Sequence, residues 1–352
     1  MKKYLQRVVL VALAVATAQM AVAESWRINN DTSKGAHFVD INEAMASELV
    51  QDGDVLYLDP GCVLTTKQTI SKAVTVIGTG WNFTGRPYQF AVLENSLDIS
   101  AAATVSGLRI MGSVYPLHND IVIERCLINT DIIHTNTSYT TQNLLIRQCL
   151  IDGYIRGCGN TSMNSFGWKI YNCCVNHKVE DTSWGTIDGL YGVEIVNNIL
   201  RHSYKSYNLI RRIRDAIVKN NILINELSSY KDNIIDGSEN VQLYNNVISA
   251  DSTTWLYYST YPNNVCVGSN TVTDFYVNTG AGGAWAQLCE GSPAIGAGEG
   301  GIDCGPYAKG SLYPFVTYGM PKHIPYFTEV NVPAQPTDGK VKVSLKIVNQ
   351  ND

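Results

Sequence analysis

Charged residues are scarce in this sequence, and their scarcity limits the partners that the protein can have. Only 16% of the 352 residues are charged and the formal net charge is −5, so no basic stripe is available to neutralise a phosphate backbone. We therefore expect no nucleic-acid partner. Asn, Tyr, Ser and Thr are frequent instead, and a polar, weakly charged surface suits sugars, which bind through hydrogen bonds and ring stacking. A polysaccharide is the expected partner.

Long apolar runs are also missing, except at the N-terminus. Residues 1–23 contain three cations, a short apolar run and then Ala21-Val22-Ala23, which is the layout of a cleaved secretory signal peptide rather than of a membrane anchor. No later stretch is long and apolar enough to cross a bilayer. We predict an exported protein (periplasmic, surface-located or secreted) of bacterial type, monomeric and without a transmembrane segment once the signal is removed.

The middle of the chain repeats one short pattern about every 24 residues. Relative to a marker residue p, an apolar or small residue recurs at p−5 and p−3, and an aliphatic one at p+2. The markers are Leu108, Cys126, Cys149, Cys173, Asn198, Asn221, Asn246 and Asn270. Such a regular period predicts a solenoid. The i, i+2 spacing is that of strands, and the change of parity before p+2 requires a bend. Each repeat should be a coil of short strands.

Stacked coils place every marker above the previous one, about 4.8 Å apart. An Asn amide can donate to one neighbour and accept from the other, so the four marker asparagines should form a ladder. The marker cysteines should continue it as small buried thiols. The crossover rule makes such a coil right-handed.

The repeated N-N-x-[IVL] turns resemble those of the right-handed parallel β-helix proteins of the pectin-lyase-like superfamily. The resemblance covers residues 52–275 and includes the usual entry motifs, Gly53-Asp54, Pro60-Gly61 and Ile77-Gly78. It implies an all-β fold, a right-handed parallel β-helix. The superfamily contains lyases, glycoside hydrolases, esterases, adhesins and non-catalytic proteins, so the resemblance does not fix a function.

Both ends of the solenoid carry a smaller element. In residues 24–51, Asp40 and Glu43 form a capping-box pattern before a short amphipathic helix, which we expect to cover the N-terminal mouth of the coil. Residues 276–352 contain a Gly-rich segment, expected to seal the last coil, and an alternating strand around residues 340–347 that predicts a β-hairpin module. Of the nine cysteines, Cys289 and Cys304 are the candidate disulfide pair.

Two polar columns emerge when successive coils are aligned on their markers. Position p−10 is occupied by Asp188, Arg211 and Asp236, and position p+4 by His177, His202 and Asn225. Candidate substrate-binding side chains lie nearby in the sequence: His177, Arg201, Lys205, Arg212 and Trp184. The other histidines, His37, His118, His134 and His323, are isolated and are expected in surface or loop positions.

Three interpretations of the p−10 column remain open. It could be a salt-bridge ladder that only stabilises the coil, or Arg211 could bind the carboxylates of an acidic polysaccharide. The third interpretation is catalysis. The resemblance implies that Arg211 would be the base of a polysaccharide lyase, with Asp188 or Asp236 as a Ca²⁺ ligand. Alternatively, Asp188 and Asp236 would act as acid and base of a glycoside hydrolase across about 9.6 Å.

In either catalytic scheme His202 or His177 could supply a proton. However, the sequence lacks the Asp-rich motifs of the superfamily's well-defined enzymes. We therefore predict a carbohydrate-active, polysaccharide-recognising β-helix protein, with lyase activity on a uronate-containing glycan as a further possibility. The alternative is a non-catalytic structural or adhesin-like surface protein.

Overall fold

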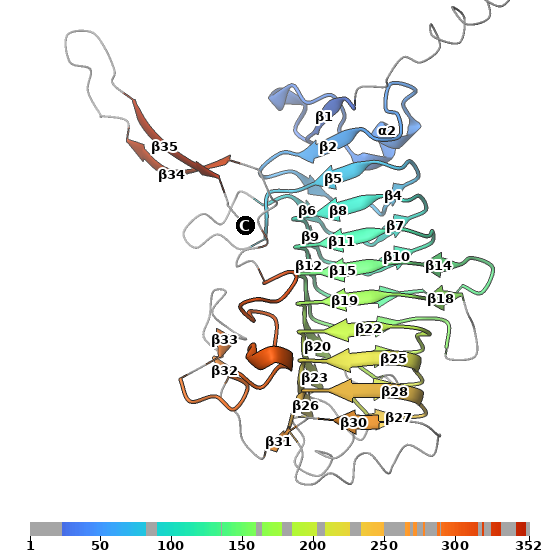
Figure 1. Ribbon diagram of the computed structural model, residues 1–352. Helices are drawn as coiled ribbons and strands as arrows, with labels where there is room; N and C mark the ends of the chain where they lie inside the picture. The colour runs from blue at the N-terminus through green and yellow to red at the C-terminus, as the bar shows by residue number, and fades with distance from the viewer. Residues whose placement is uncertain are drawn as a thin grey trace, which may run out of the picture.

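Parallel strands dominate the computed structural model of the protein (Figure 1). It describes residues 23–81, 90–134, 136–159, 164–177, 185–202, 208–225 and 234–249, together with 265–267, 270–272, 277–278, 287–288, 290–315, 319, 325–331 and 343–349. Three long sheets, here named A, B and C, run along the molecule. The protein is an all-β parallel β-helix, which confirms the predicted fold class.

Sheet A has eleven strands, listed in spatial order: β1 (Ser25–Ile28), β2 (Val55–Leu58), β5 (Thr75–Ile77), β8 (Thr104–Ser106), β11 (Val122–Glu124), β15 (Leu145–Arg147), β19 (Lys169–Tyr171), β22 (Glu194–Val196), β25 (Arg214–Lys219), β28 (Glu239–Tyr244) and β30 (Val265–Val267). Sheet B has ten: β3 (Val63–Leu64), β6 (Val92–Leu93), β9 (Arg109–Ile110), β12 (Leu127–Ile128), β16 (Leu150–Ile151), β20 (Cys174–His177), β23 (Ile199–His202), β26 (Ile222–Asn225), β29 (Val247–Ser249) and β31 (Asn270–Val272).

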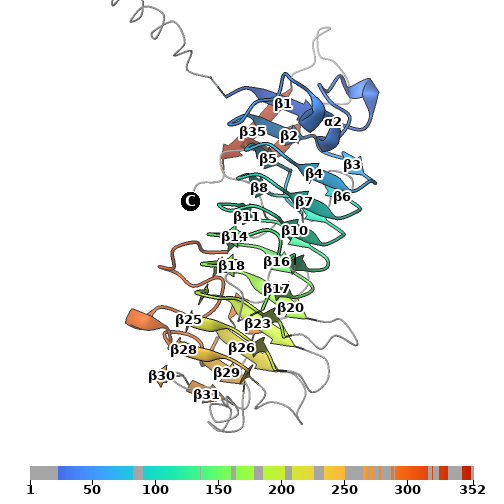
Figure 2. The ribbon, with the colours of Figure 1, turned by 90° about the vertical axis from the view of Figure 1, so that its right-hand side faces the viewer.

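Sheet C has eight strands: β4 (Gln68–Ile70), β7 (Leu97–Ile99), β10 (Val114–Pro116), β13 (Ile132–Ile133), β17 (Ile155–Arg156), β21 (Ile187–Asp188), β24 (Ile210–Arg211) and β27 (Ile235–Asp236). Each coil therefore passes through sheets A, B and C in turn, and Figure 2 shows β4, β7, β10 and β17 following one another along the stack. A short pair, β14 (Thr141–Gln142) and β18 (Ser165–Phe166), lies between sheets C and A in sequence.

The inward positions of the repeat form the core, as predicted. From the first to the seventh marker, every residue at p−5, p−3 and p+2 is at most 2% exposed, including Trp168. The amide ladder is present too: Asn198 Nδ2 donates to Asn221 Oδ1 at 3.0 Å, and Asn221 Nδ2 donates to Asn246 Oδ1 at 3.0 Å. The three marker cysteines are fully buried. The ladder fixes the bend between sheets A and B.

The residue before each marker from Cys126 to Asn246 adopts left-handed backbone. Its φ lies between 51° and 56° at Arg125, Gln148, Asn172, Asn197, Asn220 and Asn245. Asn tolerates this conformation better than most residues because its short polar side chain bonds locally. The N-N pairs thus combine a turn residue with a ladder residue.

The last coil departs from the predicted register. Asn270 is the strand partner of Val247, one residue beyond the ladder position of Asn246. Val265 and Val267 pair with the two outward residues of β28, Gln242 and Tyr244. Because this segment has apolar residues at three consecutive positions, 265 to 267, the alternating pattern fits two registers that differ by one residue. The prediction that Asn270 extends the ladder is therefore wrong.

The N-terminal end carries a helix and an extra strand. Helix α2 (Ile41–Ala46) is capped by Asp40, which accepts from Glu43 N, while Glu43 Oε2 accepts from Val39 N at 2.7 Å. A 3₁₀ turn, η1 (Thr32–Lys34), precedes it. Residues 24–36, which show no pattern in the sequence, contribute β1, and this strand pairs in parallel with β2. Sheet A thus begins inside the predicted cap.

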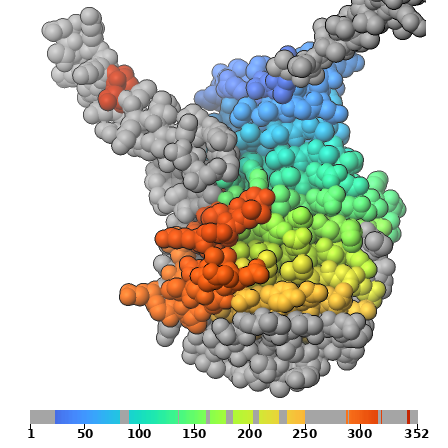
Figure 3. Space-filling view, viewed as in Figure 1, coloured from blue at the N-terminus to red at the C-terminus, as the bar shows by residue number. Residues whose placement is uncertain are grey.

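The described part of the Gly-rich segment runs back along the coils. Residues 298–315, here called the C-terminal strap, begin beside Asn220 and end beside Gln148, whose Nε2 donates to Pro314 O. They include the 3₁₀ turn η4 (Glu299–Gly301). The side-chain amides of the turn residues in the A–B bend point outward along this flank and hydrogen-bond the strap backbone, which explains the path of the strap. The strap covers that flank in Figure 3.

Further elements follow the solenoid. A small pair, β32 (Val277–Asn278) and β33 (Gln287–Leu288), is antiparallel, and so is the predicted C-terminal hairpin, β34 (Pro325–Asn331) with β35 (Ser344–Asn349). Cys304 is a free buried thiol that donates to Asn245 O, and its nominated partner Cys289 lies outside the described residues. Within the described part of the chain, no helix is long and apolar enough to cross a membrane.

Candidate functional site

The predicted charged column exists on sheet C and is one residue longer than expected. Strand pairing places Arg156 opposite Asp188, Asp188 opposite Arg211, and Arg211 opposite Asp236. Four successive coils thus present base, acid, base and acid. Counting back from the markers does not identify Arg156, because this residue precedes its marker, Cys173, by 17 positions rather than ten. The connection that follows it contains the additional strand β18.

Asp188 is a buried acid held by an arginine from the next coil. It is fully buried, and its Oδ1 accepts hydrogen bonds from Arg212 Nε at 2.7 Å and Nη2 at 2.6 Å. Gly185 N donates to Oδ2 at 3.2 Å. Burial raises the pKa of Asp188, while the nearby charge of Arg212 acts in the opposite direction. The side chain is therefore not available to a polymer on the surface.

Arg212 adopts an unusual backbone conformation to make this pair. Its φ is +49°, whereas the equivalent positions in the neighbouring coils are glycines, Gly189 at +69° and Gly237 at +58°. Left-handed backbone is uncommon for a side chain without local hydrogen bonding. The contacts with Asp188 offset its cost. Arg212, proposed from the sequence as a substrate-binding residue, is thus the ion-pair partner of Asp188.

Arg211 and Asp236 form the accessible end of the column. Arg211 Nε lies 3.7 Å from Asp236 Oδ2, and the two side chains are 21% and 40% exposed. A pair at this distance and exposure is weakly coupled. Of the p−10 residues, these two can contact a ligand, and Arg211 has the planar fork that pairs with carboxylates.

The second predicted column is also in register, but it is buried. His177, His202 and Asn225 are strand partners on β20, β23 and β26, and all three are at most 1% exposed. The His177 and His202 rings are 4.6 Å apart between centroids. Burial, with a smaller contribution from His202, lowers the pKa of His177 to about 3. His177 is therefore a neutral interior ring at neutral pH.

Of the other predicted substrate-binding residues, Arg201 is the one that the structure describes. Arg201 lies on β23 between Asn176 and Ile224 in register and is partly exposed. Trp184 and Lys205 lie outside the described residues.

His134 was expected in a surface or loop position; it lies in the connection that follows β13 (Ile132–Ile133), but it is not at the surface. The ring is fully buried, its Nδ1 lies 2.9 Å from Ser165 Oγ, and Cys158 Sγ lies 3.6 Å from the same nitrogen. Burial lowers the pKa of His134 to about 4 and raises that of Cys158. Both groups are uncharged at neutral pH, which makes this cluster a poor nucleophile–base pair. No sequence pattern indicates this cluster, because the three residues lie in different coil segments.

The sheet C carboxylates do not fit the Ca²⁺ site considered from the sequence. Ca²⁺ takes six to eight oxygen ligands, but both oxygens of Asp188 already accept hydrogen bonds, and Arg211 stands between Asp188 and Asp236 in the column. Among the described residues, no group of three or more His, Cys, Asp or Glu side chains is arranged to hold a metal ion.

Comparison with known proteins adds no further identification. No protein-family model matches the chain, and no curated protein matches it.

Proposed function

We propose that this protein is an exported β-helix protein of the pectin-lyase-like type that recognises an extended acidic polysaccharide along sheet C. The observation that carries the proposal is the four-coil column with its accessible end at Arg211 and Asp236. The column runs along the long axis of the molecule, so a linear polymer could contact several coils at once.

The charge balance favours an acidic polymer. With Arg212 included, the column region contains three arginines against two aspartates, Asp188 and Asp236. Arg212 neutralises Asp188, which leaves Arg156, Arg211 and Asp236 as the other charged members of the described column. Uronate carboxylates would pair with the arginine forks.

Recognition is better supported than hydrolysis. Asp188 has no exposed surface and is engaged by Arg212, so it is badly placed to act as the acid or base of a glycoside hydrolase. Lyase chemistry would need Arg211 as the base, and Arg211 remains accessible. Lyase activity therefore stays a secondary possibility within the proposal.

A non-catalytic structural role is the second candidate, and the buried Asp188–Arg212 pair is the observation that favours it. In that case the whole column would stabilise adjacent coils and bind nothing. The two candidates differ in whether Arg211 matters for ligand binding or only for stability.

The test uses protein lacking residues 1–23, run on native gels that contain polygalacturonate, alginate or a glycosaminoglycan. We expect retardation by at least one acidic polymer, and about a tenfold weaker interaction in Arg211→Ala, since a hydrogen-bonded charge contributes roughly 1.5–3 kcal/mol. Lys169→Ala is the matched control, because this exposed cation lies on sheet A. Equal behaviour of the two variants, or no retardation by any polymer, would refute recognition through sheet C. Unsaturated-uronate absorbance, measured in parallel, reports lyase activity.

A further inference from the structure

A cavity of about 330 Å³ lies between the outer face of sheet A and the C-terminal strap. Its floor comes from three successive coils, where Tyr171, Val196 and Lys219 are strand partners and Glu194 lies beside them. Its wall comes from the strap and includes Glu299 and Ile302. The column proposed for the acidic polymer lies on sheet C, so the cavity is a separate site.

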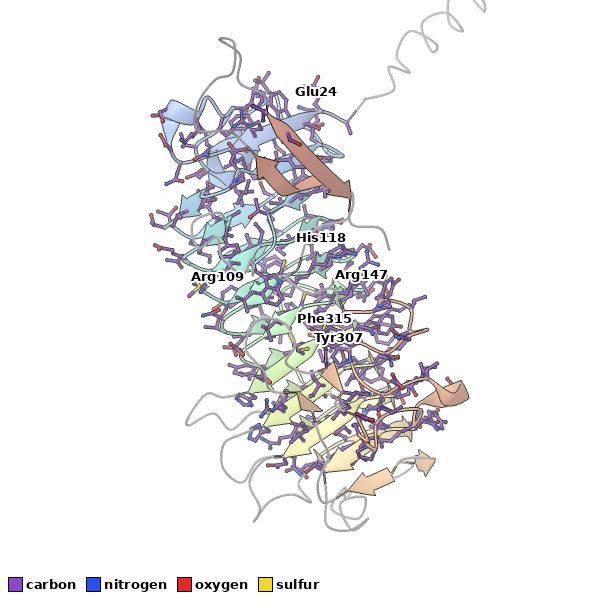
Figure 4. All side chains as sticks on the ribbon, turned by 90° about the vertical axis from the view of Figure 1, so that its left-hand side faces the viewer. Glu24, Arg109, His118, Arg147, Tyr307 and Phe315 are labelled. Carbon is purple, nitrogen blue, oxygen red and sulfur yellow. The ribbon has the colours of Figure 1, made fainter. Side chains whose placement is uncertain are left out.

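The strap is fixed by the turn residues of the A–B bend, so the cavity is formed before any ligand arrives. Asn172 Nδ2 donates to Pro306 O at 2.9 Å and to Ser311 Oγ at 2.8 Å, and Asn220 Oδ1 accepts from Glu299 N at 2.8 Å. Further along, Arg147 lies 4.4 Å from the Tyr313 ring centroid. Figure 4 shows Arg147 in the same region of the molecule as Tyr307 and Phe315 of the strap.

The cavity lining combines hydrogen-bonding groups with apolar surface. Glu194 accepts a hydrogen bond from the Tyr171 hydroxyl, and its side chain is 37% exposed, which leaves acceptor capacity for a ligand. Lys219 Nζ bonds Glu299 Oε2 at 2.9 Å across the cavity from floor to wall. Val196 and Ile302 supply apolar contacts. A ligand here meets carboxylate acceptors, an ammonium donor and aliphatic surface together.

We propose that this cavity binds a neutral sugar of one or two rings. Sugar hydroxyls donate to carboxylates and accept from ammonium groups, while the C–H faces of a pyranose pack on aliphatic side chains. The two carboxylates of the lining, Glu194 and Glu299, each have an ammonium partner: Lys169 Nζ lies 3.9 Å from Glu194 Oε1, and Lys219 Nζ lies 2.9 Å from Glu299 Oε2. Because both ammonium groups are already engaged with carboxylates, the cavity favours a neutral sugar over an acidic one. The volume lies at the lower end of the usual range for ligand pockets, which matches a small ligand.

The test titrates protein lacking residues 1–23 with neutral hexoses and their disaccharides, with galacturonate and with putrescine, by calorimetry and saturation-transfer NMR. We expect binding of at least one neutral sugar and weaker binding of the other two probes. Glu194→Ala should weaken it about tenfold by removing an ionised acceptor. Val196→Trp should abolish it by filling the floor.

Asp215→Ala is the matched control, because Asp215 is an exposed carboxylate outside the cavity and its loss should leave sugar binding unchanged. Circular dichroism checks that each variant folds. Glu194→Ala removes a hydrogen-bond acceptor whereas Val196→Trp fills the cavity, so if one variant misfolds the other still tests the proposal. Absence of binding by every neutral sugar overturns the proposal. So does tighter binding of galacturonate or putrescine, or binding that persists in Val196→Trp. Arg211→Ala should not change this binding, so the outcome is independent of the polymer proposal.

Discussion

Removing one amide from the asparagine ladder should destabilise the solenoid strongly. In Asn221→Ala, four hydrogen bonds are lost: Oδ1 no longer accepts from Asn198 N and Asn198 Nδ2, and Nδ2 no longer donates to Ile195 O and Asn246 Oδ1. Asn221 is fully buried, so water cannot replace these bonds. At a net contribution of about 1 kcal/mol each, the free energy of unfolding should fall by about 4 kcal/mol.

The matched control occupies an equivalent position in another coil. Cys149→Ala removes a buried thiol whose contacts are weak, a 3.6 Å contact with Ile123 O and a 3.2 Å contact with Arg147 O. We expect a loss of about 1 kcal/mol, the typical cost of a point mutation. Urea unfolding followed by circular dichroism compares the midpoints of the two variants, since solenoids need not unfold in two states. If the midpoint of Asn221→Ala is not lower than that of Cys149→Ala, amide hydrogen bonds do not fix the bend more than packing does.

Three further predictions concern the charged and buried groups. Arg212→Ala leaves the carboxylate of Asp188 buried without its main partner and should cost about 3 kcal/mol. Adding Asp188→Asn should recover much of that loss in thermal unfolding, whereas failure to recover would argue against the ion pair as its cause. His134 has a pKa of about 4 when folded and near 6.5 when unfolded, so the unfolded state binds more protons between these values. The contribution of His134 to stability should therefore decrease by about 3 kcal/mol as the pH falls from 6.5 to 4, and His134→Gln should remove this part of the pH dependence in denaturation midpoints at several pH values. Asp236→Asn removes the exposed acid beside the accessible Arg211 and should strengthen acidic-polymer retardation several-fold, with a steeper salt dependence. Unchanged retardation would show that the polymer does not reach this end of the column.

The core of the fold could be predicted because inward positions repeat in every coil. Ile123, Ile146 and Ile170 face the interior at the same offset from their markers, so one offset rule places many residues. The same rule gave the register of Asp188, Arg211 and Asp236, where the connections between sheets C and A have equal lengths. It failed at Arg156, since an insertion after that residue changes the count.

Features that depend on contacts between distant segments could not be predicted. Nothing in the sequence near Asn172 or Gln148 indicates that their amides bind a strap more than 130 residues later. The ion pair between Arg212 and Asp188 depends on the left-handed φ of Arg212, and an arginine at this position does not indicate such a conformation. The burial of His177 and His202, in contrast, follows from the repeat, because p+4 lies two residues after the inward p+2 position on the same sheet B strand and so faces the interior.

The outward columns explain how one repetitive scaffold can present different chemistry on different faces. Inward residues must match from coil to coil because they share one core, but outward residues do not share that core and can differ from coil to coil. On sheet C this freedom produces an arginine-rich column with Asp236 at its accessible end. On sheet A it produces a cavity whose two carboxylates, Glu194 and Glu299, are each paired with a lysine. Since sheet C offers the accessible Arg211 and the cavity offers paired charges, a single sugar class should not satisfy both. The acidic polymer and the neutral sugar are therefore expected to bind at different sites, without competing.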